Sequence, residues 1–210
     1  MRWLFALLIS SSIAQAAGEK SGDFDYYVLA LSWSPTWCAL EGDARGSAQC
    51  ADDANFGWVL HGLWPQYNKG WPSYCPTPER AASRAQTAEM ADIMGTAGSA
   101  WHQWKKHGTC SGLSAARYFG TARTAYGQIN RPEVFRKLDR AVEVPAQVIE
   151  EAFIKTNPTL APDMITVTCK SARIQEVRVC LSKDDLTPVT CGADVRRDCT
   201  LDDALLDPIR

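Results

Sequence analysis

The chain has 210 residues, of which 46% are hydrophobic and 22% are charged. This is enough apolar material for one well-packed domain, and the length is short for two. Lys and Arg number 22 against 24 Asp and Glu, so the net charge of -2 provides no global attraction to a polyanion. Any nucleic-acid binding must therefore be local.

The N-terminus has the pattern of a secretory signal peptide. Arg2 precedes an apolar run over 3–9, a Ser-rich stretch and an A-x-A cleavage motif at 14–16. The run falls short of the roughly 20 apolar residues that a bilayer span needs, which disfavours an uncleaved anchor. We expect residues 1–16 to be cleaved and residues 17–210 to form one domain without membrane contact. No Asn lies in an N-x-S/T glycosylation pattern, so a bacterial periplasm fits.

The eight cysteines predict crosslinks. None has the CxxC spacing, which argues against a zinc ribbon or a thioredoxin-type redox motif. In an oxidising compartment eight cysteines favour four disulfides, whose pairing the count alone leaves open.

The predicted elements begin with a strand over 26–33. Its alternate positions are largely apolar on both sides, which is typical of a strand buried on both faces at the centre of a sheet. A helix is predicted from Thr77-Pro78-Glu79, where a capping side chain precedes Pro, to a stop near Gly95.

Four more helices and a return to strands follow. The helices are predicted over 99–107, 114–126, 133–140 and 146–155. Val177, Val179 and Leu181 then alternate ahead of a turn signal at Asp184-Asp185. This order of a strand, several helices and then further strands, in a chain crosslinked by disulfides, predicts an α+β fold.

All three histidines lie in two short motifs. His61 is part of HGLWP, and His102 and His107 are part of WHQWKKHGTC. Histidine transfers protons in both directions near neutrality, because its ordinary pKa is about 6.5. These motifs are therefore the candidate site.

The second motif is amphipathic if Ser99 caps a helix. At about 100° per residue, four polar residues share one side: His102, Gln103, Lys106 and His107. Trp101 and Trp104 fall on the other side, where burial of both would hold the polar face rigid.

Imidazoles, an ammonium and an amide together suit in-line transfer at phosphorus. A neutral histidine can take the proton of an attacking hydroxyl, and a protonated histidine can give a proton to the leaving oxygen. Because both forms are needed at once, a bell-shaped profile of rate against pH is expected between about pH 4 and 9. Lys106 can offset charge on the equatorial oxygens, and no metal or other cofactor is required.

Two alternatives stay open at this point. Each histidine could be a hydrogen-bonded core residue, or the three could bind zinc. The zinc site is disfavoured, because His102 and His107 are five residues apart instead of the four of HExxH, and Lys106 would lie beside the cation.

The motifs resemble those of the ribonuclease T2 family. FGWVLHGLWP at 56–65 and WHQWKKHGTC at 101–110 are similar to its two signature segments. The similarity extends to YVLALSWSPTWC at 27–38 and to the order of the last four cysteines, and it is strongest to the bacterial periplasmic ribonuclease I branch. The resemblance implies a catalytic domain over 17–210, built around a central antiparallel sheet flanked by helices. It also implies a periplasmic or secreted endoribonuclease, expected as a monomer, that cleaves single-stranded RNA through a 2′,3′-cyclic phosphate with little base specificity.

The resemblance implies a role for each residue of the candidate catalytic group. His107 is expected to remove the 2′-hydroxyl proton, and His61 to protonate the 5′ leaving oxygen. His102 is expected to bind the phosphate, and Lys106 to stabilise the pentacoordinate state. Gln103 stands where the family has Glu, and an amide can hydrogen-bond a phosphoryl oxygen but cannot hold a charge or a proton.

The loss of that carboxylate has two expected consequences. The imidazolium form of His107 loses a stabilising partner, so its pKa is expected to be lower than in relatives. The alternative function is an RNA-binding or signalling protein of the same fold whose turnover is weakened by Gln103, although retention of the histidines and Lys106 argues against it.

The resemblance also implies substrate-binding residues and a disulfide pairing. Trp64 and Trp71 stand where the family places aromatic rings that stack on a base, which is sequence-tolerant. Gln66 stands where some members have Asp, so its contact with the base is expected to differ. The implied disulfides are Cys38–Cys50, Cys75–Cys110, Cys169–Cys199 and Cys180–Cys191.

Overall fold

The computed structural model describes residues 19–210, so the predicted signal peptide at 1–16 lies outside the described residues. The strands are β1 (Tyr26–Trp33), β2 (Trp58–Gln66), β3 (Val142–Val144), β4 (Ile165–Lys170), β5 (Arg173–Ser182) and β6 (Ala204–Leu206). The α-helices are α1 (Ser34–Trp37), α2 (Arg84–Glu89), α3 (Ala91–Met94), α4 (Ala97–Lys106), α5 (Ala115–Gln128) and α6 (Ala146–Thr156). Shorter helical turns are η1 (Cys38–Gly42), η2 (Ala48–Cys50), η3 (Gly108–Cys110), η4 (Glu133–Lys137) and η5 (Pro162–Met164). Over 19–210, no helix is long and apolar enough to cross a bilayer.

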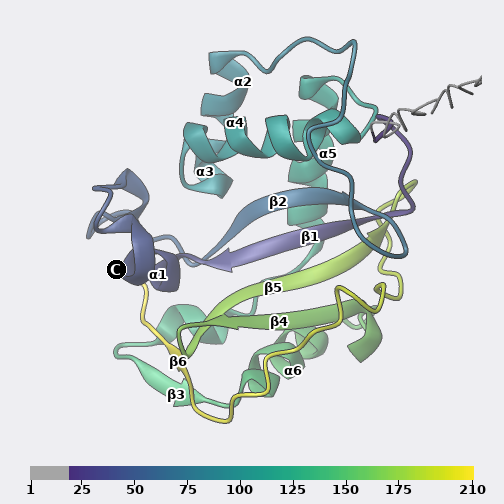
Figure 1. Cartoon of the computed structure of the whole chain (residues 1–210). Coiled ribbons are helices and arrows are strands. Elements are labelled where there is room, and N and C mark those ends of the chain that lie inside the picture. Colours follow the sequence, from purple (N-terminus) through teal and green to yellow (C-terminus); the bar gives the residue numbers. More distant parts are fainter. Residues whose placement is uncertain (1–18) are drawn as a thin grey trace, which may run out of the picture.

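The strands form one sheet in the order β2-β1-β5-β6-β3, with β4 also paired to β5 (Figure 1). The β1–β2, β1–β5, β4–β5 and β3–β6 pairs are antiparallel, whereas β5 and β6 meet in parallel. β1 is central and is buried except at Ser32, as predicted from its two apolar faces. The α+β class and the central, mainly antiparallel sheet are thereby confirmed.

The two faces of the central strands have different neighbours. One face of β1 carries Tyr27, Leu29, Leu31 and Trp33 into the main core, which also contains buried residues of α4, α5 and α6. The opposite face packs a smaller apolar cluster near the start of β1. Further along this second face, apolar packing gives way to polar side chains, and the candidate site lies there.

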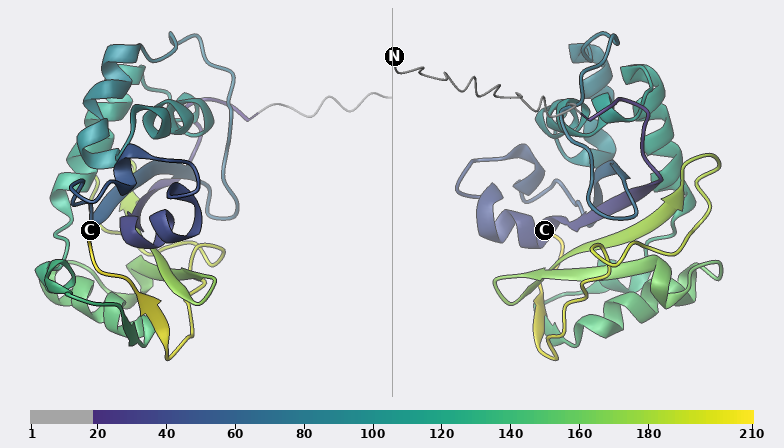
Figure 2. Two further views of the ribbon diagram at one scale, coloured as in Figure 1. Left: turned by 90° about the vertical axis from the view of Figure 1, so that its left-hand side faces the viewer. Right: turned by 45° about the vertical axis from the view of Figure 1, so that its right-hand side comes forward.

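Apart from the short helix α1, which directly follows β1, the helices lie in two groups. Helices α2 to α5 gather beyond β2, while α6 lies at the other end of the sheet with β3 and β6 (Figures 1 and 2). Buried side chains of α5 and α6 contribute to the same core, so both groups anchor on the sheet. The helix that carries the second histidine motif, α4, belongs to the first group and packs near β2.

The helix predicted to begin at Thr77 begins later. Helix α2 starts at Arg84, because Ser83 and Gln86 form a capping box in which each side chain accepts a hydrogen bond from the other's backbone N–H. The Thr77 hydroxyl accepts from the Glu79 N–H without starting a helix. A break at Met90 divides the single predicted helix into α2 and α3. The predicted stop near Gly95 is correct, since α3 ends at Met94 and Gly95 follows with a positive φ of 77°, which suits glycine.

The remaining helices agree with prediction except at two ends. Helices α5 and α6 match the segments 114–126 and 146–155. Helix α4 is capped by Thr96, whose hydroxyl accepts from the Ser99 N–H, so Ser99 lies in its first turn and is not the cap. The helix predicted over 133–140 is a 3₁₀ turn that ends at Lys137, because the backbone of Leu138 is extended toward β3.

Four disulfides crosslink the described chain, and they leave no free cysteine in it. They are Cys38–Cys50, Cys75–Cys110, Cys169–Cys199 and Cys180–Cys191. These are the four pairs that the family resemblance implies. Crosslinks of this kind stabilise a small secreted domain by restricting its unfolded state.

Candidate active site

His61 is presented by a β-bulge in β2. Along the β1–β2 ladder Ala30 pairs with Gly62 and Leu31 pairs with Leu60, which leaves His61 as the extra residue. A bulge of this kind redirects a side chain and often lies next to an active site. The His61 side chain is 43% exposed and faces the polar part of the sheet.

Helix α4 presents the second histidine motif. His102 and Lys106 lie on its accessible side, and His107 follows directly, with its N–H still bonded to the Gln103 carbonyl. Trp104 is buried, as predicted, but Trp101 is 40% exposed, so the prediction that both tryptophans are buried is wrong for Trp101. The buried residues of α4 are Ala100, Gln103 and Trp104.

One cleft of about 270 Å³ brings the candidate residues together. All of the predicted catalytic and substrate-binding residues line it: His61, Trp64, Gln66, Trp71, His102, Gln103, Lys106 and His107. A wider groove of about 750 Å³ adjoins it and shares His61, His102 and Gln103. Residues far apart in the sequence therefore form one continuous polar surface.

Trp64 connects α4 to His107, the candidate proton acceptor. Its indole N–H donates to the Gln103 side-chain oxygen at 2.8 Å, and its ring stacks on that of His107 with centroids 5.2 Å apart. Gly62 is required beside this hydrogen bond, because a Cβ there would lie 2.2 Å from the Gln103 oxygen. Gln103 thus holds Trp64, and Trp64 in turn holds the His107 ring.

His107 is kept neutral by its surroundings. Burial lowers its pKa to about 3, and the positive charges of Lys106, His61 and His102 add to the effect. Its Nδ1 is buried and has no hydrogen-bond partner among the described residues. A neutral imidazole of this kind can accept a proton. The pKa of His102 is also lowered, by burial first and then by neighbouring cations.

Two functional candidates on β5 escaped the sequence prediction. Glu176 is only 2% exposed, pairs with Nδ1 of His61 through one oxygen and accepts two hydrogen bonds from Arg178 through the other. Arg178 lines the cleft and lies 5.3 Å from the centre of the Trp64 ring. The available signal was a Glu and an Arg at alternate positions of one strand, but this pattern does not say what faces that strand.

The rings predicted to bind a base differ in accessibility. Trp71 is 54% exposed at the rim of the cleft, whereas Trp64 is half-buried against His107 and Arg178. Gln66 is buried, and its amide donates to the Pro65 carbonyl at 3.0 Å.

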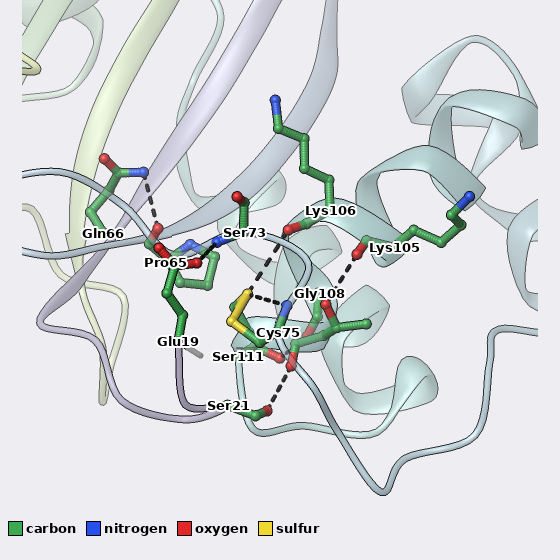
Figure 3. Close-up of a disulfide and its surroundings, with 12 residues drawn as sticks. Glu19, Ser21, Pro65, Gln66, Ser73, Cys75, Lys105, Lys106, Gly108 and Ser111 are labelled. Carbon is green, nitrogen blue, oxygen red and sulfur yellow. Dashed lines mark hydrogen bonds between the residues drawn. A yellow bond between two sulfur atoms is a disulfide. The ribbon is translucent and has the colours of Figure 1, made fainter. Parts of the chain in front are cut away.

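The Cys75–Cys110 disulfide links the loop after β2 to the segment that follows α4, close to Lys106 (Figure 3). Cys75 follows the segment that carries Trp71, and Cys110 follows the end of α4. The Tyr74 N–H also donates to the Lys106 carbonyl at 2.8 Å. The loop after β2 is therefore fixed to the helix end beside the catalytic candidates.

Comparisons with known proteins agree with this architecture. The profile of the ribonuclease T2 family matches residues 24–191. A ribonuclease of Aeromonas hydrophila is 34% identical over 206 residues, which cover 95% of this chain and 93% of that protein. Ribonuclease I of Escherichia coli is 26% identical, with 85% and 83% covered. The similarity thus includes the bacterial branch of the family.

Solved structures show the same fold. A ribonuclease-related protein from Calystegia sepium superposes with a TM-score of 0.67 at 22% identity, covering 89% of this chain and 97% of that one. RNase NT, solved in complex with 5′-AMP, superposes with a TM-score of 0.63 at 19% identity, with 90% and 100% covered. The chain therefore belongs to the ribonuclease T2 family and is an endoribonuclease.

Proposed function

We propose that this endoribonuclease cleaves RNA by metal-independent transesterification through a 2′,3′-cyclic phosphate. The observation that carries the proposal is the cleft that holds two unlike histidines: His107 is buried with no hydrogen-bond partner for Nδ1 among the described residues, and His61 is paired with a carboxylate. One is suited to accept a proton and the other to supply one. The remaining cleft residues can bind the phosphate between them.

The first chemical step uses these groups as follows. His107 accepts the proton of the 2′-hydroxyl as O2′ forms a bond to phosphorus. The bond between phosphorus and O5′ breaks, and His61 gives its proton to O5′. Lys106 offsets the charge on the phosphoryl oxygens, His102 binds the phosphate, and Gln103 holds the surrounding rings in place. In the second step water attacks the cyclic phosphate, and the two histidines exchange roles.

Base binding is assigned chiefly to Trp71. Its exposed ring can stack on any base, which contributes about 1 to 3 kcal/mol and gives little sequence preference. Trp64 can offer less of its ring, because His107 and Arg178 already contact it. Gln66 lines the same cleft, and because its amide nitrogen is bonded to the Pro65 carbonyl, we assign its contact with a base edge to the side-chain oxygen. The wider groove beside His61 is suited to the nucleotide that leaves with O5′.

The proposed setting is the periplasm or the extracellular medium. It is supported by the signal-peptide pattern at 1–16 and by the four disulfides, which persist in oxidising compartments. The mature protein is then a single catalytic domain over 17–210, active as a monomer on single-stranded RNA. Size-exclusion chromatography with light scattering tests the monomer.

The alternative is an RNA-binding or signalling protein whose turnover is weakened by Gln103. The absence of a carboxylate at position 103 favours it. Against it stand the complete set of histidines and Lys106 in one cleft, and the buried carboxylate on β5.

The test is digestion of homopolymeric RNA by purified protein in the presence of EDTA, with products resolved by mass spectrometry. We expect 2′,3′-cyclic phosphate ends on all four homopolymers and no cleavage of single-stranded DNA, which lacks the internal nucleophile. Loss of activity in EDTA, or equal cleavage of DNA, would overturn the mechanism. Binding of RNA without turnover would support the alternative.

A further inference from the structure

We infer that Glu176 is a positioning residue of the reaction, which holds His61 as the proton donor and keeps one fixed nitrogen of its ring facing the substrate. The inference rests on the proposed transesterification and names a residue that neither histidine motif contains. Glu176 lies 115 residues from His61 in the sequence, and the β1–β2 and β1–β5 pairings bring the two together.

Every oxygen of Glu176 is committed. One accepts from the Ser32 hydroxyl at 3.1 Å and contacts Nδ1 of His61. The other accepts from Nε and Nη2 of Arg178 at 3.0 and 2.7 Å. Burial alone would raise the pKa of Glu176, but the bonds and charges of His61 and Arg178 outweigh it and lower the pKa to about 2. The carboxylate therefore keeps its negative charge throughout the working range of pH.

The contact between Glu176 and Nδ1 decides which nitrogen of His61 gives its proton to the leaving oxygen. With Nδ1–H donating to Glu176, the second proton of the imidazolium is on Nε2, on the far side of the ring. Nε2–H gives that proton to O5′, and the Nδ1 proton stays with Glu176. The neutral ring then has its lone pair on Nε2, ready to accept a proton from water in the second step. A carboxylate that orients a histidine in this way fixes its tautomer and stabilises its imidazolium form.

Glu176 also gives the site a negative charge that α4 lacks. Position 103 is Gln in this chain, so the carboxylate that the family places beside the phosphate is missing from the helix. The buried carboxylate on β5 instead lines the adjoining groove, where it contacts Nδ1 of His61 on the side of the ring opposite the proton-donating Nε2. The counter-charge therefore contacts Nδ1 of His61, whereas the buried Nδ1 of His107 has no hydrogen-bond partner among the described residues.

Several other charged groups face His61, and a pH experiment must take them into account. Those that line the cleft or the groove with His61 are Arg178 on β5, His102 and Lys106 on α4, His107 after α4, Asp194 after β5, Glu41 on η1, Arg45 after η1 and Lys170 on β4. Arg178 is the nearest cation to the Glu176 carboxylate, with which it forms a paired hydrogen bond. Removing the Arg178 guanidinium and removing the Glu176 carboxylate should therefore move the basic limb of the pH–rate profile in opposite directions.

The test compares Glu176→Gln, Arg178→Gln and the control Asp207→Asn by pH–rate profiles on a dinucleotide substrate. Asp207 follows β6 and pairs with Arg173 at the start of β5, so the control removes the carboxylate partner of another β5 arginine, and neither residue lines the cleft. In Glu176→Gln the imidazolium loses its counter-charge, so kcat falls about 10- to 100-fold and the basic limb moves to lower pH. In Arg178→Gln that limb moves to higher pH, and in Asp207→Asn it does not move.

Two further measurements keep the inference falsifiable if Glu176→Gln is poorly folded. Long-range ¹H–¹⁵N NMR of the wild-type protein should show the neutral His61 ring protonated at Nδ1, and an Nε2–H tautomer would overturn the inference. Glu176→Gln should also add little to the loss of kcat in His61→Ala. If the wild type forms cyclic phosphate and His61→Ala is impaired, but the basic limb is the same in Glu176→Gln, the inference fails alone. If no cyclic phosphate forms, the proposed function fails.

Discussion

The three histidines have the same side chain, and their surroundings give them different chemistry. His107 is buried against the Trp64 ring, His61 is bonded to a buried carboxylate, and His102 is exposed where the cleft meets the groove. Burial disfavours the charged imidazolium, whereas a neighbouring carboxylate favours it. The division of roles therefore follows from the positions of the residues in the fold, and it can be tested by replacing one histidine at a time.

Replacement of His61 or His107 by Ala should lower kcat by at least 10²- to 10⁴-fold, because each removes one proton transfer. RNA binding should persist in both variants. His102→Ala should be milder and should act partly through KM, since this residue is proposed to hold the phosphate. Steady-state kinetics on one dinucleotide measure all three. A loss of kcat in His102→Ala as deep as that in His107→Ala would show that the roles are assigned wrongly.

The buried position of His107 predicts where the acidic limb of the rate profile lies. The base must be neutral, so kcat/KM falls as pH decreases through its pKa, which is lowered to about 3. Above about pH 4 only the basic limb should therefore be seen, in contrast to the bell expected from histidines with ordinary pKa values. Circular dichroism at each pH separates this limb from acid unfolding. An acidic limb near pH 6 would contradict a neutral, desolvated His107.

The Gln103→Glu variant tests His107 by a change that should raise its pKa. A carboxylate beside the His107 ring would favour the imidazolium form, so the acidic limb should move to higher pH. The new side chain can still accept the hydrogen bond from Trp64, so the ring stacking should be kept. Gln86→Glu, in the capping box of α2, is the matched control and should leave the profile unchanged. An unchanged profile in Gln103→Glu would mean that position 103 does not influence the base.

At the scale of elements, two local rules decided how well the helices could be predicted. Ser114 caps α5 at the predicted place, whereas Ser83 and Gln86 start α2 well after the Thr77-Pro78 signal. A reciprocal capping box satisfies two backbone N–H groups, and a single hydroxyl ahead of Pro satisfies one. Sequence alone could not decide between these signals, because both patterns are common helix starts.

The loop between β2 and α2 depends on its disulfide for its position. Replacing Cys75 and Cys110 by Ser should lower the free energy of unfolding by about 3 to 4 kcal/mol, as expected for a crosslink that closes a loop of this length. KM should also rise, because Trp71 and the end of α4 are no longer joined. Replacing Cys169 and Cys199 is the matched control: the sequence separations are 35 and 30 residues, and this second pair joins β4 to the C-terminal segment. Urea unfolding and kinetics on both variants measure the two effects. An equal rise of KM in both would refute a specific role of the Cys75–Cys110 bond at the cleft.

At the scale of the whole molecule, the sequence revealed the residues of the two motifs but not their neighbours. Their spacing, together with the family resemblance, was enough to place the histidines and Lys106 in one cleft. Glu176 and Arg178 could not be found in this way, because their contacts arise only when β5 pairs with β1. Likewise, the exposure of Trp101 and the contacts of Trp64 depend on how α4 packs near β2. Tertiary packing decides which polar residues of a strand become functional.

The distribution of charge over the molecule predicts weak dependence of RNA binding on salt. The net charge is -2, and the cleft is lined by two permanent cations, Lys106 and Arg178, and by the carboxylate of Asp194. Arg178 is paired with Glu176, and in the adjoining groove Arg45 and Lys170 are both paired with Glu41, which reduces their attraction for phosphate. Each phosphate neutralised on a single strand contributes a slope of about -0.7 in log K against log salt, so two contacts give at most about -1.4.

Titration of a single-stranded oligonucleotide with the His107→Ala protein at increasing salt measures this slope without cleavage. Lys106→Gln in that background should reduce the slope by about 0.7, because one phosphate contact is lost. Lys155→Gln, on α6 at the far end of the sheet, should leave it unchanged. A slope steeper than about -4 would require a longer cationic track than the cleft provides. The enzyme would then bind RNA through a surface outside the two histidine motifs, despite its negative net charge.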